Sequence, residues 1–113
     1  MTTAREVMTM RVGEILDFGF NYRREMLFGD LLTATAGNNL WTITGTGTAP
    51  TLGAKTVNII DVVIDSEVVP AYMLTASYLN AALATAGDYV VTNTVTTAQG
   101  RKFVKDFLLS VSV

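Results

Sequence analysis

Carboxylates are the only side chains in this sequence that could carry out acid–base or metal chemistry. The chain has ten Asp and Glu residues, no His and no Cys, so the usual general base, zinc ligands and thiol nucleophile are all missing. Asp61 and Asp65 stand four residues apart in one expected strand and share a face, and with Glu67 they could in principle bind Ca²⁺. Their spacing matches no calcium loop, and solvent-facing charges on a strand explain them more simply.

The serines and the glycine-rich segment supply no catalytic motif either. A serine triad is excluded because none of the four Ser residues has a His partner. Residues 45–53 are rich in Gly, but neither Gly-Lys-Ser/Thr nor an expected helix follows, and a phosphate loop needs both. The sequence therefore predicts that the protein is not an enzyme and binds no cofactor and no metal.

Composition indicates one folded domain. Half of the 113 residues are hydrophobic and 16% are charged, which excludes disorder. A net charge of −2 without a basic stripe argues against nucleic-acid binding. No apolar run is long enough for a membrane span, and the N-terminus is no secretory signal, so we expect folding in the cytoplasm. A chain with this many apolar residues has either a dense core or an apolar surface that a partner covers.

A period of two runs through most of the chain, which is the strand signature. Strands are expected over residues 14–22, 31–44 (one broken strand or two), 55–65, 68–75, 89–97 and 102–113, whereas residues 77–86 read as a short helix or another strand. We predict an all-β fold, an immunoglobulin-like antiparallel β-sandwich of about seven strands with at most one short helix. The sandwich would span residues 13–113, with residues 1–12 as an N-terminal arm.

The inward positions of these strands define the predicted core, and two apolar segments define the predicted interface. Tyr89, at the start of the penultimate strand, is typical of a tyrosine corner. Pro70 cannot donate to a ladder, so its strand is an edge strand or begins after it. The core candidates are Phe18, Phe20, Trp41, Ile43, Tyr89, Val91, Phe103, Phe107 and Leu109. The interface candidates are Met8, Met10, Val68, Val69, Pro70 and Tyr72.

Several short motifs together resemble the fiber-tail adaptor proteins of phages and prophages, a group of small virion proteins. They are Glu14-Ile15-Leu16-Asp17-Phe18, Gly29-Asp30, Trp41-Thr42-Ile43, Thr85-Ala86-Gly87, Tyr89-Val90-Val91-Thr92-Asn93, Val95-Thr96-Thr97 and Gly100-Arg101. The resemblance covers residues 13–113 and is most specific in the closing motif. The chain departs from the family pattern in residues 55–76, which are longer and more apolar, and in residues 1–12, which lack an Asp-Pro lead-in.

The resemblance implies a virion structural protein that links tail or portal-proximal parts to tail fibers. Its expected partners are other virion proteins (tail, portal-proximal, fiber or capsid), in several copies within a symmetric assembly, with neither nucleic acid nor membrane. Two alternatives stay open. One is a capsid decoration protein on the phage head. The other is a carbohydrate-binding receptor-recognition module, for which Trp41, Tyr72 and Tyr78 are the candidate aromatic residues.

Overall fold

The computed structural model of the 113-residue chain describes residues 6–26 and 29–113, apart from the side chains of residues 36, 69–74 and 76. The strands of these ranges are β1 (Glu6–Arg11), β2 (Ile15–Asn21), β3 (Asn39–Gly45), β4 (Thr51–Ile64), β5 (Glu67–Asn80), β6 (Gly87–Thr96) and β7 (Lys102–Ser112). A 3₁₀ turn, η1 (Ala36–Asn38), precedes β3. Within the described ranges, no helix has the length and apolar character needed to cross a membrane.

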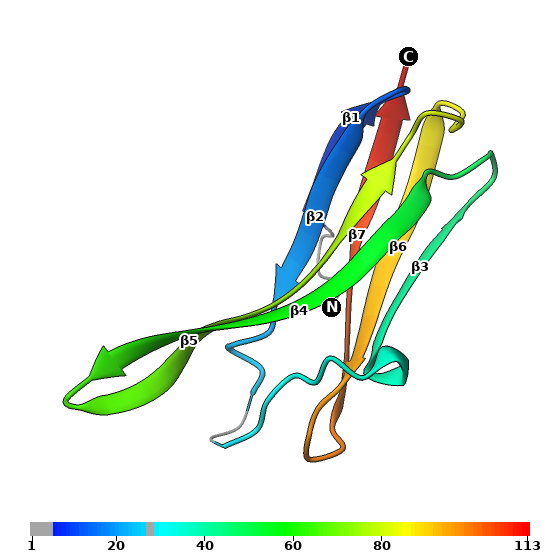
Figure 1. Ribbon diagram of the computed structural model, residues 1–113. Coiled ribbons are helices and arrows are strands. Elements are labelled where there is room, and N and C mark those ends of the chain that lie inside the picture. The colour runs from blue at the N-terminus through cyan, green and yellow to red at the C-terminus, as the bar shows by residue number, and fades with distance from the viewer. Residues whose placement is uncertain (1–5, 27–28) are drawn as a thin grey trace.

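Two sheets form a sandwich with immunoglobulin connectivity (Figure 1). One sheet has the order β1-β7-β6-β3 and the other β2-β5-β4. With β1 to β7 taken as strands A to G, these are the sheets A-G-F-C and B-E-D of an immunoglobulin-like domain, with the first strand paired to the last. The predicted fold class is therefore confirmed.

The predicted N-terminal arm is wrong for the part that the structure describes. β1 pairs in parallel with β7, with Met8 opposite Leu109 and Met10 opposite Val111. The pairing satisfies the backbone hydrogen-bonding groups on the open edge of β7. It also turns the apolar side chains Met8 and Met10 of β1 toward the core. Met10 is 2% exposed and Met8 packs partly buried against the core, so neither is an accessible interface residue in the single chain. Residues 1–5 of the predicted arm lie outside the description.

Two other segments follow expectation in part. Within residues 31–44, Leu32 makes only an isolated bridge to Thr97, and continuous pairing begins at Asn39. Residues 77–86 are not a helix, because β5 continues through Asn80 and a short turn follows. The pairing of β5 with β2 and β4 on its two sides outweighs the Ala-rich local sequence.

The predicted core is confirmed at its centre and partly buried at its margins. Trp41, Tyr89, Val91, Phe107 and Leu109 are buried, whereas Phe18, Phe20, Ile43 and Phe103 are partly buried and pack against the buried residues. Aromatic rings join the two sheets. Phe18 of β2 stacks on Phe107 of β7 with ring centroids 5.3 Å apart, and Phe20 lies 5.5 Å from Trp41.

The predicted tyrosine corner is also confirmed. The Tyr89 hydroxyl lies 2.8 Å from the Thr85 carbonyl oxygen and 3.0 Å from that of Thr48, so it can donate to either. The ring packs so tightly on the β3–β4 connection that a Cβ at Gly45 or Gly47 would collide with Tyr89. The glycines in this loop therefore make room for the corner.

A buried amide lies between the sheets and uses all four of its hydrogen-bonding positions. Oδ1 of Asn93 accepts from the hydroxyls of Tyr22 (2.9 Å) and Thr75 (2.8 Å). Its Nδ2 donates to Asn39 Oδ1 (2.9 Å) and to the Leu40 carbonyl oxygen (3.0 Å). Thr75 belongs to β5 and Tyr22 directly follows β2, whereas the other three residues belong to β3 and β6. A single side chain thus bonds to both layers.

The network continues outward through Asn39. Its Oδ1 also accepts from Trp41 Nε1 (3.1 Å), and its Nδ2 donates to the Thr56 carbonyl oxygen of β4 (3.4 Å). Asn93 and Thr75 have no exposed surface. A fully satisfied buried network of this kind specifies one arrangement of the sheets, because any shift leaves polar groups unpaired.

Asn93→Ala should lower the free energy of unfolding by about 3 kcal/mol or more, because it leaves several buried partners without a hydrogen bond. Urea denaturation followed by Trp41 fluorescence measures the change. Asn58→Ala, at an exposed position of β4, is the matched control and should change stability by less than about 0.5 kcal/mol. A loss below about 1 kcal/mol for Asn93→Ala would contradict the assigned role of the amide.

Candidate functional site

A hairpin arm projects from the sandwich (Figure 1). β2 pairs with β5 only from Leu74 to Asn80, whereas β4 and β5 remain paired outward to Ile64 and Glu67. Residues 59–73 therefore form a two-stranded ribbon, which we call the ribbon, extending roughly 20 Å at the usual rise per residue. The radius of gyration is 15.6 Å, against about 13 Å for a compact chain of this length.

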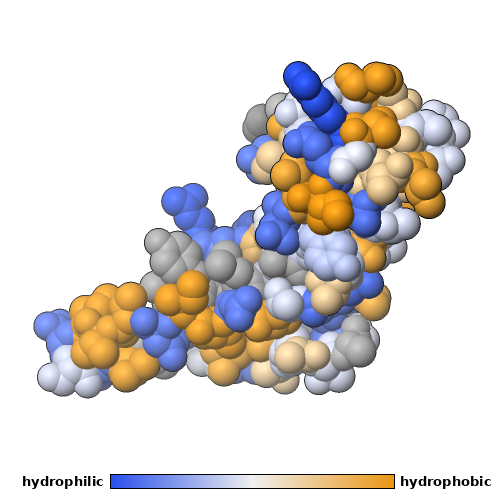
Figure 2. Space-filling model, turned by 45° about the horizontal axis from the view of Figure 1, so that its top comes forward, coloured by the Kyte–Doolittle hydropathy of each residue, from blue (hydrophilic) through white to orange (hydrophobic). Residues whose placement is uncertain are grey.

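The ribbon is apolar on both faces and exposed on both. Successive strand residues point to opposite faces, so Ile60, Val62 and Ile64 share one face and Ile59 and Val63 the other. All five are exposed; Val63 is 70% exposed, and its cross-strand neighbour Val68 is 66% exposed. Figure 2 shows apolar side chains along the projecting arm. A continuous apolar run is typical of strands covered on both sides, so the ribbon has the surface of an element that a partner encloses.

The carboxylates of the ribbon are surface charges. Asp61, Asp65 and Glu67 are exposed, and residues 56–73 contain no Lys or Arg, so the ribbon carries three negative charges. Nowhere in the described part of the chain do three acidic side chains come together as a metal site would require. The charges give the ribbon an electrostatic preference for a cationic surface.

The ribbon ends in a two-residue turn at Asp65 and Ser66, with φ of 50° and 64°. Two central residues with positive φ are the mark of a type I′ turn, whose twist matches that of the flanking strands. The turn lies one residue earlier than the sequence suggested, because Glu67 already pairs with Ile64 as the first residue of β5. Asp tolerates this conformation better than Ser does.

The prediction that Pro70 lies in an edge strand, or before the strand begins, is wrong for β5 as a whole, because β5 begins at Glu67 and is the middle strand of its sheet, but β5 has an open edge at Pro70 itself. Pro70 pairs with Asp61 in a stretch of β5 that β2 does not reach, so on that side no neighbouring strand requires a donor. The register shifts between Ile60 and Asp61, and such bulges protect open edges from indiscriminate pairing. Val68 is exposed as predicted, whereas the side chains of Val69, Pro70 and Tyr72 lie outside the description.

Two of the three candidate aromatic residues for a carbohydrate platform can be placed. Trp41 is 6% exposed and donates to Asn39 within the core, so the expectation that it could stack on a ligand is wrong. Tyr78 is partly exposed and lies over Gly53, where a Cβ would collide with its ring. Tyr72 cannot be added, because its side chain is among those not described.

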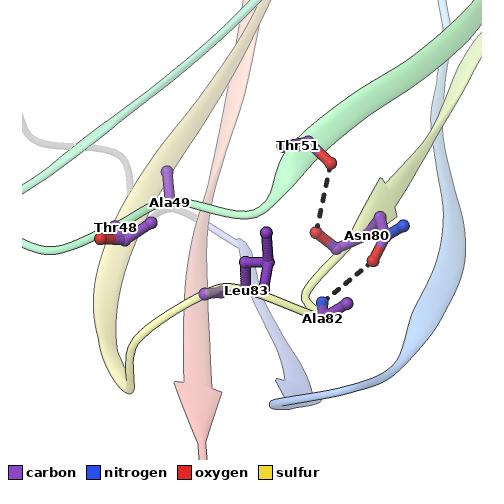
Figure 3. Close-up of a pocket in the computed structure, with 7 residues that line it drawn as sticks. Thr48, Ala49, Thr51, Asn80, Ala82 and Leu83 are labelled. Carbon is purple, nitrogen blue, oxygen red and sulfur yellow. Dashed lines mark hydrogen bonds between the residues drawn. The ribbon is translucent and has the colours of Figure 1, made fainter.

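A shallow hollow of about 210 Å³ lies away from the ribbon, between the β3–β4 and β5–β6 connections (Figure 3). Its lining is uncharged and mostly apolar, with Leu83 at its centre in the view of Figure 3. Its polar groups bond to one another: Asn80 Oδ1 accepts from the Ala82 backbone N–H (2.9 Å), and Thr51 Oγ1 donates to the Asn80 carbonyl oxygen (3.5 Å). The hollow therefore presents no acid, base or nucleophile.

Positive charge gathers where the β2–β3 connection meets the β6–β7 turn. Residues 21–26, 29–30 and 98–106 contain five basic and three acidic residues, an excess of two positive charges. The two segments touch: Lys105 Nζ lies 2.7 Å from Glu25 Oε1 and donates to the Asn21 carbonyl oxygen. Arg101 lies 3.6 Å from Asp30. We call this region the basic end.

Asp30 holds the basic end together. Its side chain is buried and its Oδ1 accepts from the backbone N–H groups of Leu31 (2.9 Å) and Gln99 (3.0 Å). Burial raises the pKa of this carboxyl, but the hydrogen bonds from Thr97, Gln99 and Leu31 and the charge of Arg101 outweigh burial, so the pKa is lowered overall. The ionised carboxylate therefore joins the two segments.

Asp30→Asn should destabilise the protein by about 1–2 kcal/mol at pH 7, because hydrogen bonds to a charged acceptor are lost. A lowered folded-state pKa stabilises the fold above the ordinary carboxyl pKa, and this contribution disappears as pH falls through the folded-state value. The difference in free energy of unfolding between parent and variant should therefore become smaller below about pH 4. Denaturation at several pH values measures it. Asp17→Asn, at an exposed position, is the control, and a gap that does not depend on pH would contradict the assignment.

Ser66→Gly should stabilise the ribbon locally, because Gly adopts positive φ without the cost that Ser incurs. We expect amide hydrogen exchange in residues 60–68 to slow about two- to fivefold, the equivalent of about 0.5–1 kcal/mol. The rest of the sandwich should exchange as before, since the ribbon opens independently. Ser112→Gly, at the exposed end of β7, should leave the ribbon unchanged. Faster exchange in the Ser66→Gly variant would contradict the turn assignment.

No protein-family model, curated protein or solved structure matches this chain. Among the described surfaces, the ribbon combines exposed apolar faces with negative charge.

Proposed function

We propose that this protein is a phage virion structural protein, a tail or neck adaptor that connects tail or portal-proximal parts to tail fibers by protein–protein contacts. One observation carries the proposal: residues 59–73 project as a ribbon whose described apolar side chains are exposed on both faces. The sequence motifs that resemble the fiber-tail adaptor proteins supply the setting.

Energetics support a docking role for the ribbon. An isolated two-stranded hairpin is marginally stable in water, and fully burying a Val or Ile side chain contributes about 1.5–3 kcal/mol. Six Val and Ile side chains of the ribbon are partly exposed in the single chain, so burying their exposed surface against a partner would contribute several kcal/mol to binding. That is comparable with the lower estimates of the cost of bringing two proteins together, about 4 kcal/mol. A partner would therefore gain affinity and order the ribbon at the same time.

The backbone edges of the ribbon support the same role. β4 is the outer strand of its sheet, and β5 has no neighbour but β4 between Glu67 and Met73. Both edges of the ribbon can therefore accept a strand from another chain, a recurrent mode of docking. An arm of this length reaches across to a neighbour, which suits an adaptor better than the flat footprint of a shell-binding decoration protein. The burial of Trp41 weakens the carbohydrate-binding alternative.

We expect the chain in purified particles at about a dozen copies, as the rotational symmetry of a neck or tail requires. Quantitative mass spectrometry measures the copy number, and electron microscopy with a specific antibody locates the protein. Hundreds of copies on the head would replace the proposal with the decoration role, and absence from particles would overturn it.

The ribbon is tested in the same particles with Val63→Thr combined with Val68→Thr. Threonine keeps the β-branched shape but buries a hydroxyl at the contact, so we expect fewer fibers per particle and lower infectivity. Ile15→Thr, at an exposed position at the start of β2, whose other end, Asn21, lies at the basic end, is the control and should assemble normally.

A further inference from the structure

We infer that the ribbon of one copy docks on the basic end of a second copy of this chain, head to tail. The inference rests on the proposed function insofar as that function places several copies in one assembly. It adds the partner of the ribbon and the surface that receives it.

Charge complementarity identifies the receiving surface. The ribbon carries three negative charges, and the basic end has an excess of two positive charges. A two-fold contact between two ribbons would place like charges together, which is unfavourable. A head-to-tail contact instead places the ribbon of each copy on the basic end of the next.

An apolar row that suits the ribbon adjoins the basic end. Leu40 of β3 pairs with Thr94 of β6, which pairs with Val104 of β7, so the three side chains form one row on the outer face of their sheet. Leu40 is 51% exposed and Val104 60% exposed. Lys102 and Asp106 lie two residues on either side of Val104 in the same strand, hence on the same face, and Lys102 is the one nearer the β6–β7 turn. A ribbon with carboxylates therefore fits this apolar row with its charges toward the turn, where Lys102 lies.

The placement of the two surfaces suits a side-by-side arrangement of copies. In Figure 1 the ribbon extends to the lower left, whereas the start of β3 and η1 lie at the lower right. Copies arranged around an axis parallel to the sandwich strands would bring each ribbon to the β3 side of its neighbour at the same level. Contacts of this heterologous kind can close into a ring.

A charge swap tests the contact in solution with the full chain. Glu67→Lys and Lys102→Glu, each alone, should weaken self-association at least about tenfold, because each brings like charges together at the contact. The double variant exchanges the two charges and should associate within about threefold of the parent. Analytical ultracentrifugation at low salt measures this, and near-UV circular dichroism of Trp41 checks the fold. A parent chain that stays monomeric at 100 µM (roughly the range of weak contacts), or a double variant as weak as the two losses combined, would overturn the inference.

Cross-linking supplies a second measurement that does not depend on charge. The chain has no Cys, so a Val63→Cys and Leu40→Cys double variant can form disulfides only between introduced thiols. These positions lie at the ribbon and at the sandwich, so we expect a ladder of cross-linked oligomers under oxidation. Val63→Cys alone should give no cross-link, whereas efficient dimers from that variant would indicate a two-fold ribbon contact and overturn the inference. Particle copy number is measured separately, so the self-contact and the virion role can fail independently.

Discussion

The structure depends on the amide of Asn93, which is buried between two sheets that otherwise meet through apolar contacts. Four hydrogen bonds hold it, two from hydroxyl groups on the β2–β5 side and two to acceptors on β3. Aromatic packing would tolerate some sliding between the layers, because dispersion contacts are numerous and weakly directional. A satisfied buried amide does not tolerate it, because each lost hydrogen bond leaves a polar group without a partner.

The same network holds the root of the ribbon. Thr75 of β5 bonds to Asn93, and the Thr56 carbonyl oxygen of β4 accepts from Asn39. Val57 is the cross-strand partner of Thr75, so both strands are anchored just before they leave the sandwich. The anchor allows a hairpin that would be marginal by itself to project in a defined direction. The rigid sandwich and the exposed ribbon are therefore parts of one mechanical unit.

Function, in this interpretation, comes from surface rather than chemistry. The ionisable groups with shifted pKa values serve structure: Asp30 joins two loops, and burial together with the charge of Glu25 raises the pKa of Tyr22, whose neutral hydroxyl donates to Asn93. The described surface includes an acidic apolar ribbon and, next to the basic end, an apolar row. Complementary surfaces of this kind direct assembly and set the register between subunits.

The sequence by itself determined the all-β class, the inward parity of the strands and the tyrosine corner, because these follow from local periodicity and from one residue type at one position. It also indicated that residues 55–76 were unusually long and apolar. The sequence predicted Met8 and Met10 as interface residues. A short apolar segment has the same pattern whether it pairs with its own sheet or binds another protein. Asn93 carried a signal that went unused: it is the polar member of the inward row Tyr89, Val91, Val95.

Only the tertiary structure decided which apolar residues are covered. The pattern of residues 57–64 is that of a strand buried on both faces, and nothing local tells whether the cover comes from the same chain. Strand pairing resolved this, because β2 ends its pairing with β5 at Leu74 and leaves the outer part of the hairpin without a neighbour. Burial depends on contacts between residues far apart in the chain. The positions of the strands could therefore be predicted from the sequence, whereas the exposure of the ribbon could not.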